Sequence, residues 1–390
     1  MIYITRYLLA SAIACSTAFC AFGQGPFYPP RTNAMPEIAA RTQAERSSRD
    51  SSAEASLLVN TWMGERQAQD LLTVSGGGKE DYCSSTANRW WIQADALFWD
   101  RIGNGCDQIL VLETDPPEAA LLRTDNLDFS MEPGWRVLVG YRPDPHSVLG
   151  CCSALEFSYF GVYGWEDSAA AVGDQNLRIP GDLSLATNNF LFADEIRAVY
   201  RSRLNNFEAN CIKSCCADCS TQIDFLAGFR FLALNEDFSL IGTDLQEGTS
   251  SYDISTSNYL YGLQMGGRMT RHLQQWSLQF TGKAGLFLND AEQSQIVTDF
   301  PNAPDAFVHR DVPGVSGTSA AMLGEIDLTL VRRITDVWSA RLGYSVMGLG
   351  GLALAPDQLD FSLTPASGTN LSKDGFVLFH GVHVGLQAGW

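Results

Sequence analysis

The sequence lacks the long apolar runs of a helical membrane protein. Outside the N-terminus, no stretch approaches the roughly 18 consecutive apolar residues that indicate a membrane-spanning helix. Charged residues are also scarce, at 18% of the 390 residues, whereas hydrophobic residues make up 45%. This composition excludes a disordered chain, because such chains combine low hydrophobicity with high charge.

The motifs of common enzyme classes are missing as well. Histidine occurs only five times, and the chain has no HExxH motif, no phosphate-binding loop and no GxGxxG after a predicted strand. GVSG at 314–317 departs from the G-x-S-x-G nucleophile elbow. We therefore expect no catalytic residue, no metal site and no cofactor. A hydrolase site at a loop rim, with His309 near Asp305 and Asp311, is kept as an alternative.

The N-terminus predicts export. Arg6 precedes an apolar run over 7–22, and small residues stand at the positions that a signal peptidase prefers before Gln24. We assign residues 1–23 to a secretory signal peptide, with a membrane anchor or lipid attachment at Cys15 as alternatives. Residues 24–88 are rich in Ser, Ala, Arg and Gln and predict a flexible, low-complexity periplasmic tail.

From residue 90 onward, apolar residues occur at every second position. In WWIQADALFW, Ile92 and Phe98 share one face, while Gln93 and Asp95 lie on the other. Such alternation is typical of strands with one apolar face. The pattern predicts strands at 90–101, 133–142, 153–164, 193–210, 221–235, 252–270, 274–290, 319–332, 336–349 and 375–390.

Long and short connections alternate between these strands. Outer-membrane barrels show this pattern, with short periplasmic turns and longer external loops. Closure of the sheet also leaves no unpaired backbone edge in hydrocarbon. We therefore predict that residues 89–390 form a single all-β domain, a transmembrane antiparallel up-and-down β-barrel of about 10 strands (8–12). A soluble secreted β-sandwich is the rival fold.

The net charge of −18 is concentrated in the predicted long loops, which are rich in Asp and Glu. These loops are either solvated surface or a negative mouth that attracts cations. Aromatic residues near strand ends, among them Trp90, Trp276, Trp338 and Trp390, fit an interfacial girdle, although strands favour aromatic residues in any case.

The polar faces of the predicted strands supply candidate pore-lining residues. In a closed barrel, the face opposite the lipid-facing one points inward. The inward groups either neutralise one another in a closed lumen or line a narrow water path. The candidates are Asp95, Glu195, Arg197, Arg201, Arg203, Asp224, Arg230, Lys283, Glu325, Asp327 and Arg341.

Export makes disulfides the default expectation for the cysteines beyond the predicted signal peptide, with free thiols as an open alternative. A metal site is the alternative, but the cluster at 211–219 has no second CxxC at zinc-finger spacing and no nearby histidine. The spacing does not define the pairing. The candidate disulfide cysteines are Cys151, Cys152, Cys211, Cys215, Cys216 and Cys219.

The final segment HVGLQAGW predicts the closing strand of the barrel. His383, Gly385, Ala388 and Trp390 follow the spacing polar–x–Gly–x–x–apolar–x–aromatic. This spacing resembles the terminal signal that the outer-membrane assembly machinery reads. We therefore expect the barrel assembly machinery and outer-membrane lipid as partners, an outer-membrane location and no nucleic-acid partner.

Several segments also resemble a known family. They are WIQADALFW (91–99), EPGWRVLVGYRPD (132–144), LEFSYFG (155–161), DFLAGFRFLALNEDF (224–238), NYLYGLQMG (258–266), KAGLFLN (283–289) and LALAPDQL (352–359). In this order they resemble the putative β-barrel porins of planctomycete-type bacteria, over roughly residues 90–390. The resemblance implies an outer-membrane barrel with a transport function, and it supplies no ligand-binding residues.

The leading functional hypothesis is a porin for the passive diffusion of small solutes or ions, cations included, through a narrow polar lumen. The alternative is a non-conducting structural or adhesive barrel that acts through its acidic surface loops.

Overall fold

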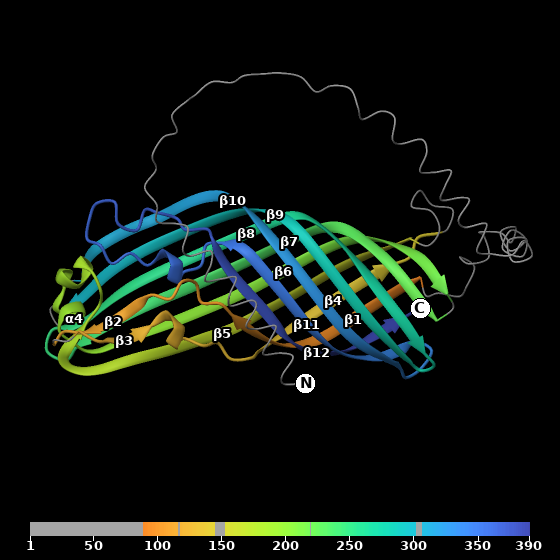
Figure 1. The fold of residues 1–390 in the computed structure, drawn as a ribbon, viewed down its shortest axis with the longest axis horizontal. Coiled ribbons are helices and arrows are strands. Elements are labelled where there is room, and N and C mark those ends of the chain that lie inside the picture. The colour runs from red at the N-terminus through yellow and green to blue at the C-terminus, as the bar shows by residue number, and fades with distance from the viewer. Residues whose placement is uncertain (1–88, 116–117, 145–152, 219, 302–305) are drawn as a thin grey trace, which may run out of the picture. The chain divides into compact units, whose positions relative to one another are not determined.

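Ten long strands pair in a closed ring (Figure 1). The computed structural model describes residues 89–115, 118–144, 153–218, 220–301 and 306–390. Each strand runs antiparallel to its neighbours, and the β5–β6 pairing closes the ring. In ring order the strands are β1 (Trp90–Ile102), β4 (Glu132–Tyr141), β5 (Ser153–Arg178), β6 (Ala193–Asp218), β7 (Thr221–Asp244), β8 (Gly248–Leu273), β9 (Trp276–Pro301), β10 (Phe307–Arg333), β11 (Trp338–Leu352) and β12 (Gly375–Gly389).

Short elements gather in the connections. The hairpin of β2 (Ile109–Glu113) and β3 (Ala120–Arg123) pairs with the far end of β5. The 3-10 helices η2 (Thr124–Asn126), η3 (Asp182–Ala186) and η4 (Pro356–Gln358) and the single-turn α4 (Asn188–Leu191) complete the connections. Among the described residues, no helix is long and apolar enough to cross a membrane.

The single antiparallel barrel is confirmed, but the strands are longer than the sequence pattern predicted. Segments 165–178 and 236–244 and much of 291–318 were expected to be loops, yet they continue β5, β7, β9 and β10. The acidic residues of these segments that the structure describes therefore lie on strands. The expected signal peptide (1–23) and tail (24–88) lie outside the described residues and stay predictions.

The two ends of the barrel differ in their connections. We call the "terminal end" the one where β1 begins and β12 finishes, and where the tight turns 274–275 and 334–337 lie. The "loop end" carries the connections 103–131, 179–192 and 353–374. The part of the ring nearest each end is called the terminal half or the loop half.

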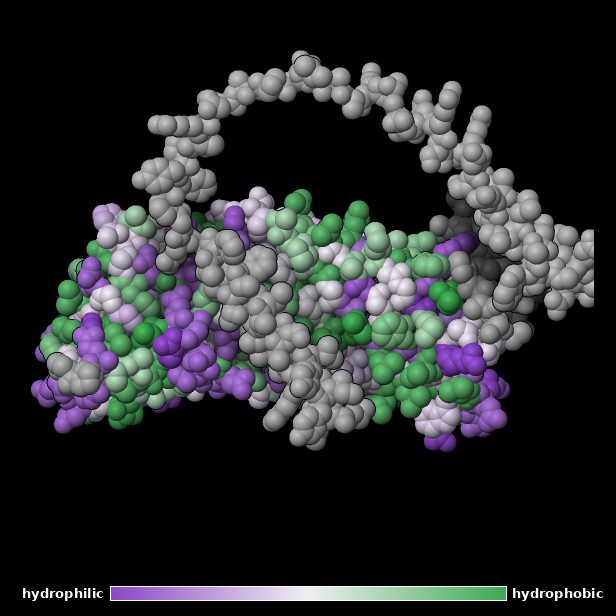
Figure 2. Space-filling model, in the orientation of Figure 1, coloured by the Kyte–Doolittle hydropathy of each residue, from purple (hydrophilic) through white to green (hydrophobic). Residues whose placement is uncertain are grey.

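The polarity of the inward and outward faces is opposite in the two halves of the barrel, as β8 demonstrates. In the terminal half, Leu263 and Met265 face outward, whereas Gln264 is buried inside. In the loop half the exposed Ser255 faces outward, and Ile254 is buried inside. In Figure 2, hydrophobic side chains gather over the terminal half. A lipid-facing band around the terminal half and a water-facing loop half explain this change.

The interior of the loop half is a packed hydrophobic core. Its side chains come from the strands and from the connections that fold over the end of the barrel. Large members that are almost completely buried include Trp165, Leu177, Phe190, Tyr200, Phe238, Tyr252 and Phe379. This half is therefore built like a small water-soluble barrel, filled by its own side chains.

Candidate functional site in the barrel lumen

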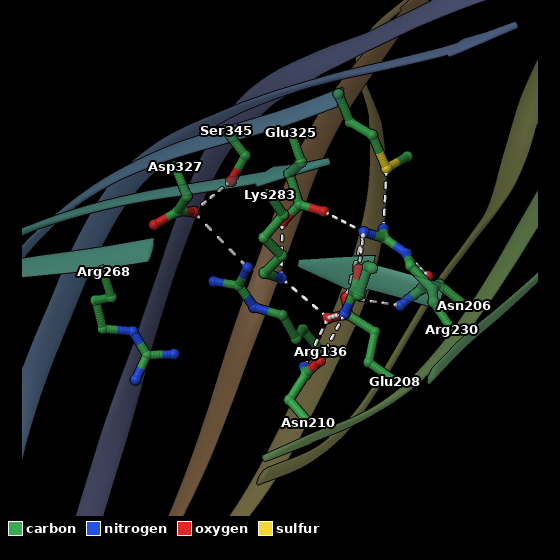
Figure 3. A network of polar contacts seen from close by, with 12 residues as sticks. Arg136, Asn206, Glu208, Asn210, Arg230, Arg268, Lys283, Glu325, Asp327 and Ser345 are labelled. Carbon is green, nitrogen blue, oxygen red and sulfur yellow. Dashed lines mark hydrogen bonds and ion pairs between the residues drawn. The ribbon is translucent and has the colours of Figure 1, made fainter. Parts of the chain in front are cut away.

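A network of ion pairs crosses the lumen of the terminal half. Arg230 of β7 is fully buried, and its Nη1 lies 2.6 Å from Glu325 Oε2 of β10 and 3.6 Å from Glu208 Oε1 of β6. Lys283 of β9 contacts the same two carboxylates at 3.0 and 3.1 Å. These side chains point toward one another across the lumen (Figure 3). Two positive and two negative groups neutralise one another here.

A second group of charges adjoins the first. Arg136 of β4 lies 2.7 Å from Asp95 of β1 and 3.8 Å from Asp327 of β10. Asp327 accepts a hydrogen bond from Ser345 at 2.6 Å and lies 2.9 Å from His383 Nε2. Nearby, Arg268 of β8 donates two hydrogen bonds, of 2.9 and 2.8 Å, to the carboxylate of Glu156 on β5.

Seven of the predicted pore-lining residues face the interior. They belong to the terminal half, where the polar face of each strand does point inward, as the sequence analysis assumed. They are Asp95, Asp224, Arg230, Lys283, Glu325, Asp327 and Arg341. Six of them are buried, and Lys283 is half-buried. Whether they line a conducting pore remains a prediction.

The four predicted residues on β6 do not face the lumen. Glu195, Arg197, Arg201 and Arg203 lie on the outer face of the loop half, with side chains 37–53% exposed. Arg197 pairs with Glu195, and Arg201 pairs with Glu166 on the neighbouring strand. The prediction was wrong because it assumed that the apolar face of β6 contacts lipid. This part of β6 belongs to the loop half, where the apolar face points into the barrel and the charged face points to water.

Sequence reasoning missed Arg136, Glu208 and Arg268. Each shares the inward parity of its strand: Glu208 lies between the outward Phe207 and Ala209, and Arg136 follows the outward Trp135. The alternation was therefore available as a signal. For Glu208, the missing information was the position along β6 at which the lipid-facing stretch begins.

The C-terminal strand β12 pairs with β1 in the ring. The backbone amides and carbonyls of Trp90 and Trp390 exchange two hydrogen bonds of 3.0 Å. Gly385 lies against Asp95, and a side chain at this position would overlap the Asp95 carboxylate. Ala388 pairs with Ile92 and Trp338 on its two sides. The assembly-signal role of His383, Gly385, Ala388 and Trp390 stays a prediction.

Residues 353–374, which we call the plug, enter the lumen of the loop half. Gly351 has a φ of +88°, and a side chain there would meet the backbone of Ala320, so glycine permits β11 to turn inward. Asn258 of β8 then exchanges two 2.8 Å hydrogen bonds with the backbone of Ala353. Ala353, Leu354 and Ala355 are completely buried.

Side chains of the barrel wall hold the backbone of the plug. Glu236 accepts a hydrogen bond of 2.9 Å from the Ala355 amide. Gln295 donates to the Gln358 carbonyl at 2.8 Å, and Arg310 donates to the Asp360 carbonyl at 2.8 Å. The segment LALAPDQL, which contributed to the family resemblance, is the start of this plug.

Asp357 anchors the plug to another connection. Its Oδ1 accepts a hydrogen bond of 2.6 Å from the backbone amide of Cys106. Burial raises the pKa of Asp357 from 3.8 to about 6, and the nearby Glu236 adds to this rise, whereas the Cys106 amide and Arg101 oppose it. The seated plug therefore favours the protonated form of Asp357.

The cysteine expectation is wrong for Cys211, whose thiol is free and exposed on the outer face of β6. Alternation along β6 turns this residue away from the lumen, toward the lipid-facing surface. The side chains of Cys215 and Cys216, and the whole of Cys151, Cys152 and Cys219, lie outside the described part of the chain, so their disulfides stay predictions.

Only two residues of the hydrolase alternative, His309 and Asp311, lie in the described part of the chain. Asp305 lies outside the described residues, and Asp311 is exposed. The Nε2 atom of His309 is buried without a hydrogen-bond partner among the described residues. The described residues also contain no cluster of three His, Cys, Asp or Glu side chains that could hold a metal ion.

A family model for "Putative beta barrel porin-7" matches residues 91–390. The chain belongs to this family. The family and the barrel fold together indicate an outer-membrane β-barrel protein, in agreement with the resemblance seen in the sequence. No curated protein matches the chain.

Solved outer-membrane barrels are similar only at the level of general architecture. The outer membrane protease OmpT from Escherichia coli is 8% identical, with a TM-score of 0.45 over 79% of this chain and 100% of that one. A major outer membrane protein from Thermus thermophilus is 10% identical, with a TM-score of 0.32 over 78% and 100%. The translocator domain of the autotransporter NalP from Neisseria meningitidis is 10% identical, with a TM-score of 0.31 over 83% and 95%. Likenesses this distant carry no argument about activity.

Proposed function

We propose that the protein is an outer-membrane channel for the passive diffusion of small polar solutes or ions, and that the plug closes its lumen in the conformation described above. The polar interior of the terminal half carries this proposal. Most of the loop half is filled with apolar side chains around a buried ion pair of Arg101 and Glu236. In the terminal half, by contrast, a network of Arg230, Glu325 and their partners crosses the lumen. Buried ion pairs add little net stability over a well-packed apolar core. A function in transport accounts for their presence.

The way in which the plug is held supports a closed state that can open. Much of its attachment consists of hydrogen bonds to its backbone from Asn258, Gln295 and Arg310. A neutral hydrogen bond contributes about 1 kcal/mol. Opening must also expose the buried Leu354 and Ala355, so the seated plug is the stable state and opening is the rarer event. The ion pairs below the plug then form a narrow, charge-balanced constriction.

Single-channel recording in planar bilayers tests the proposal. The wild-type protein is compared with a variant in which a short Gly-Ser linker replaces 354–372, and with Arg310→Ala. We expect rare, small conductance steps from the wild type and more frequent, larger steps from both variants. Arg332→Ala is the matched control, because Arg332 is exposed near the terminal end, where it lies 5.1 Å from the ring of Trp276. If the linker variant, shown to be folded by heat-modifiable gel mobility, conducts no current even with Arg230→Ala added, the channel proposal is rejected.

A non-conducting structural or adhesive barrel is the second candidate. It is favoured by the hydrophobic core and plug that together occupy the loop half. In this case both variants stay silent in bilayers, whereas removal of the β2–β3 hairpin impairs envelope integrity or attachment.

A further inference from the structure

A pocket opens in the lumen near the terminal end, beyond the ion-pair network. It has a volume of about 230 Å³. Four glutamines from four strands line it: Gln93 of β1, Gln222 of β7, Gln279 of β9 and Gln387 of β12. At roughly 30 Å³ for each water molecule in the liquid, the pocket offers the space of about eight waters. A solute the size of one sugar ring is of this order.

The amide groups of these glutamines are only partly used within the protein. Gln387 Oε1 accepts from Gln93 Nε2 at 3.4 Å and from Arg341 at 3.2 Å, and Gln279 Oε1 accepts from Arg341 at 3.5 Å. Gln222 Nε2 donates to Asp224 at 2.8 Å. The remaining half of each amide has no partner among the described residues. Two donors and two acceptors are thus available to a ligand, and hydroxyl groups can satisfy either kind.

The charges around the pocket are already balanced. Two acidic residues, Glu156 and Asp224, and two arginines, Arg142 and Arg268, line it. Arg268 is held by both oxygens of Glu156, at 2.9 and 2.8 Å. A charged ligand would therefore displace an existing ion pair, whereas a neutral ligand would leave the pairs intact. The lining thus favours a neutral polar solute.

Trp91 adds a fixed aromatic surface to the wall. Its ring lies against Gly140, where any side chain would overlap the indole, and the guanidinium of Arg142 lies 5.7 Å from the ring centre. Most small-molecule sites have a predominantly apolar lining with a few convergent polar groups. This pocket has the reverse balance, which suits a solute rich in hydroxyl groups. Trp91 thus gives the wall a rigid apolar part, and the glutamine amides give it the groups that meet hydroxyls.

We propose that this pocket is a binding subsite for a neutral polyhydroxylated solute about the size of a monosaccharide. The subsite names the class of solute for the channel proposed above and rests on that proposal. The pocket lies between the terminal end and the ion-pair network. A solute that enters from the terminal end would meet it first, and a solute that enters from the loop end would leave it last.

Saturation-transfer NMR on the folded, full-length protein in lipid nanodiscs tests the subsite, with D-glucose as the probe. We expect transfer to the glucose ring protons and millimolar binding. In Gln279→Met the affinity for glucose should fall about fivefold, which corresponds to one lost neutral hydrogen bond. Gln222→Met serves as a second variant if the first does not fold. Gln246→Met is the matched control, because Gln246 lies in an exposed turn at the loop end.

Two results would overturn the subsite: no transfer to glucose from the wild type, or equal transfer from the wild type and a folded pocket variant. Stronger binding of glycine, a zwitterion, than of glucose would overturn the proposed class of solute. The channel itself is judged separately, by the conductance of the plug variants. Glucose binding with silent plug variants would reject the channel alone, and conductance without glucose binding would reject the subsite alone.

Discussion

The terminal half and the loop half of this barrel share the same strands but have opposite polarity. Along β8 the hydrogen-bonded ladders to β7 and β9 continue from one half to the other. The outward side chains nevertheless change from Ser255 and Ser257 to Leu263 and Met265. The backbone therefore specifies only the alternation of faces. The surroundings, water or hydrocarbon, decide which face is apolar.

The two halves also differ in what occupies their interior. Apolar side chains, the plug and the buried ion pair of Arg101 and Glu236 fill the loop half, whereas a larger network of ion pairs and a polar pocket occupy the terminal half. Stability explains the apolar part of the first arrangement, because apolar burial drives folding in water. The second arrangement adds little to stability, so its explanation lies in function.

Two phenylalanines on β7 offer the largest expected contrast. Phe238 is completely buried in the loop half, whereas Phe225 is exposed on the lipid-facing side of the terminal half. Phe238→Ala should cost about 3–5 kcal/mol and increase hydrogen exchange throughout the loop half. Phe225→Ala should cause a clearly smaller loss, measured by denaturation in lipid vesicles. Equal losses would contradict the assignment of a packed core to the loop half.

Arginine substitutions on the outer face of β8 compare the surroundings of the halves. Met265→Arg places a charge in the lipid-facing band and should destabilise the folded barrel by about 2–4 kcal/mol. Ser255→Arg lies on the water-facing side and should change the free energy of unfolding by less than about 0.5 kcal/mol. Reversible urea unfolding in vesicles measures both. Comparable effects of the two substitutions would contradict a boundary between lipid-facing and water-facing surface on β8.

Two glutamates, both predicted to face the lumen, allow a buried ion pair to be compared with an exposed one. Glu325 contacts both Arg230 and Lys283 inside the barrel, whereas Glu195 pairs with Arg197 on the outer surface. Glu325→Gln should cost about 1–3 kcal/mol, because buried cations lose a charged partner. Glu195→Gln should leave the urea midpoint unchanged, since exposed pairs contribute little. The reverse order of effects would mean that Glu195 has the inward position.

The smallest expected effect is the pH dependence of the plug. Because the pKa of Asp357 rises from 3.8 to about 6 in the seated plug, its contribution favours seating fully below pH 3.8 and is lost as the pH rises through about 6. Proteolysis or hydrogen exchange of 353–374 should therefore be faster at pH 7.5 than at pH 4.5. Asp357→Asn should reduce this difference, and an unchanged difference in that variant would exclude Asp357 as its source.

The sequence predicted the ring of strands because alternation is a local property. It also placed residues such as Asp95 and Glu325 correctly, since their strands have apolar neighbours on the lipid-facing side. It failed for Arg197 because alternation does not reveal where along a strand the lipid ends. The plug was missed for a different reason: its seating depends on Asn258, Gln295 and Arg310, which are distant in sequence from the loop that they hold.

Hydroxyl-radical footprinting of the protein in lipid nanodiscs tests the boundary between the halves most directly. Met265 and Leu286 are 70% and 74% exposed on the terminal half, while Phe300 and Phe307 are 51% and 60% exposed toward the loop end. Their exposure on the protein surface is thus comparable, and only lipid should distinguish them. We predict rapid oxidation of Phe300 and Phe307 and strong protection of Met265 and Leu286. Oxidation of Met265 and Leu286 as fast as that of the two phenylalanines would contradict a lipid-facing terminal half.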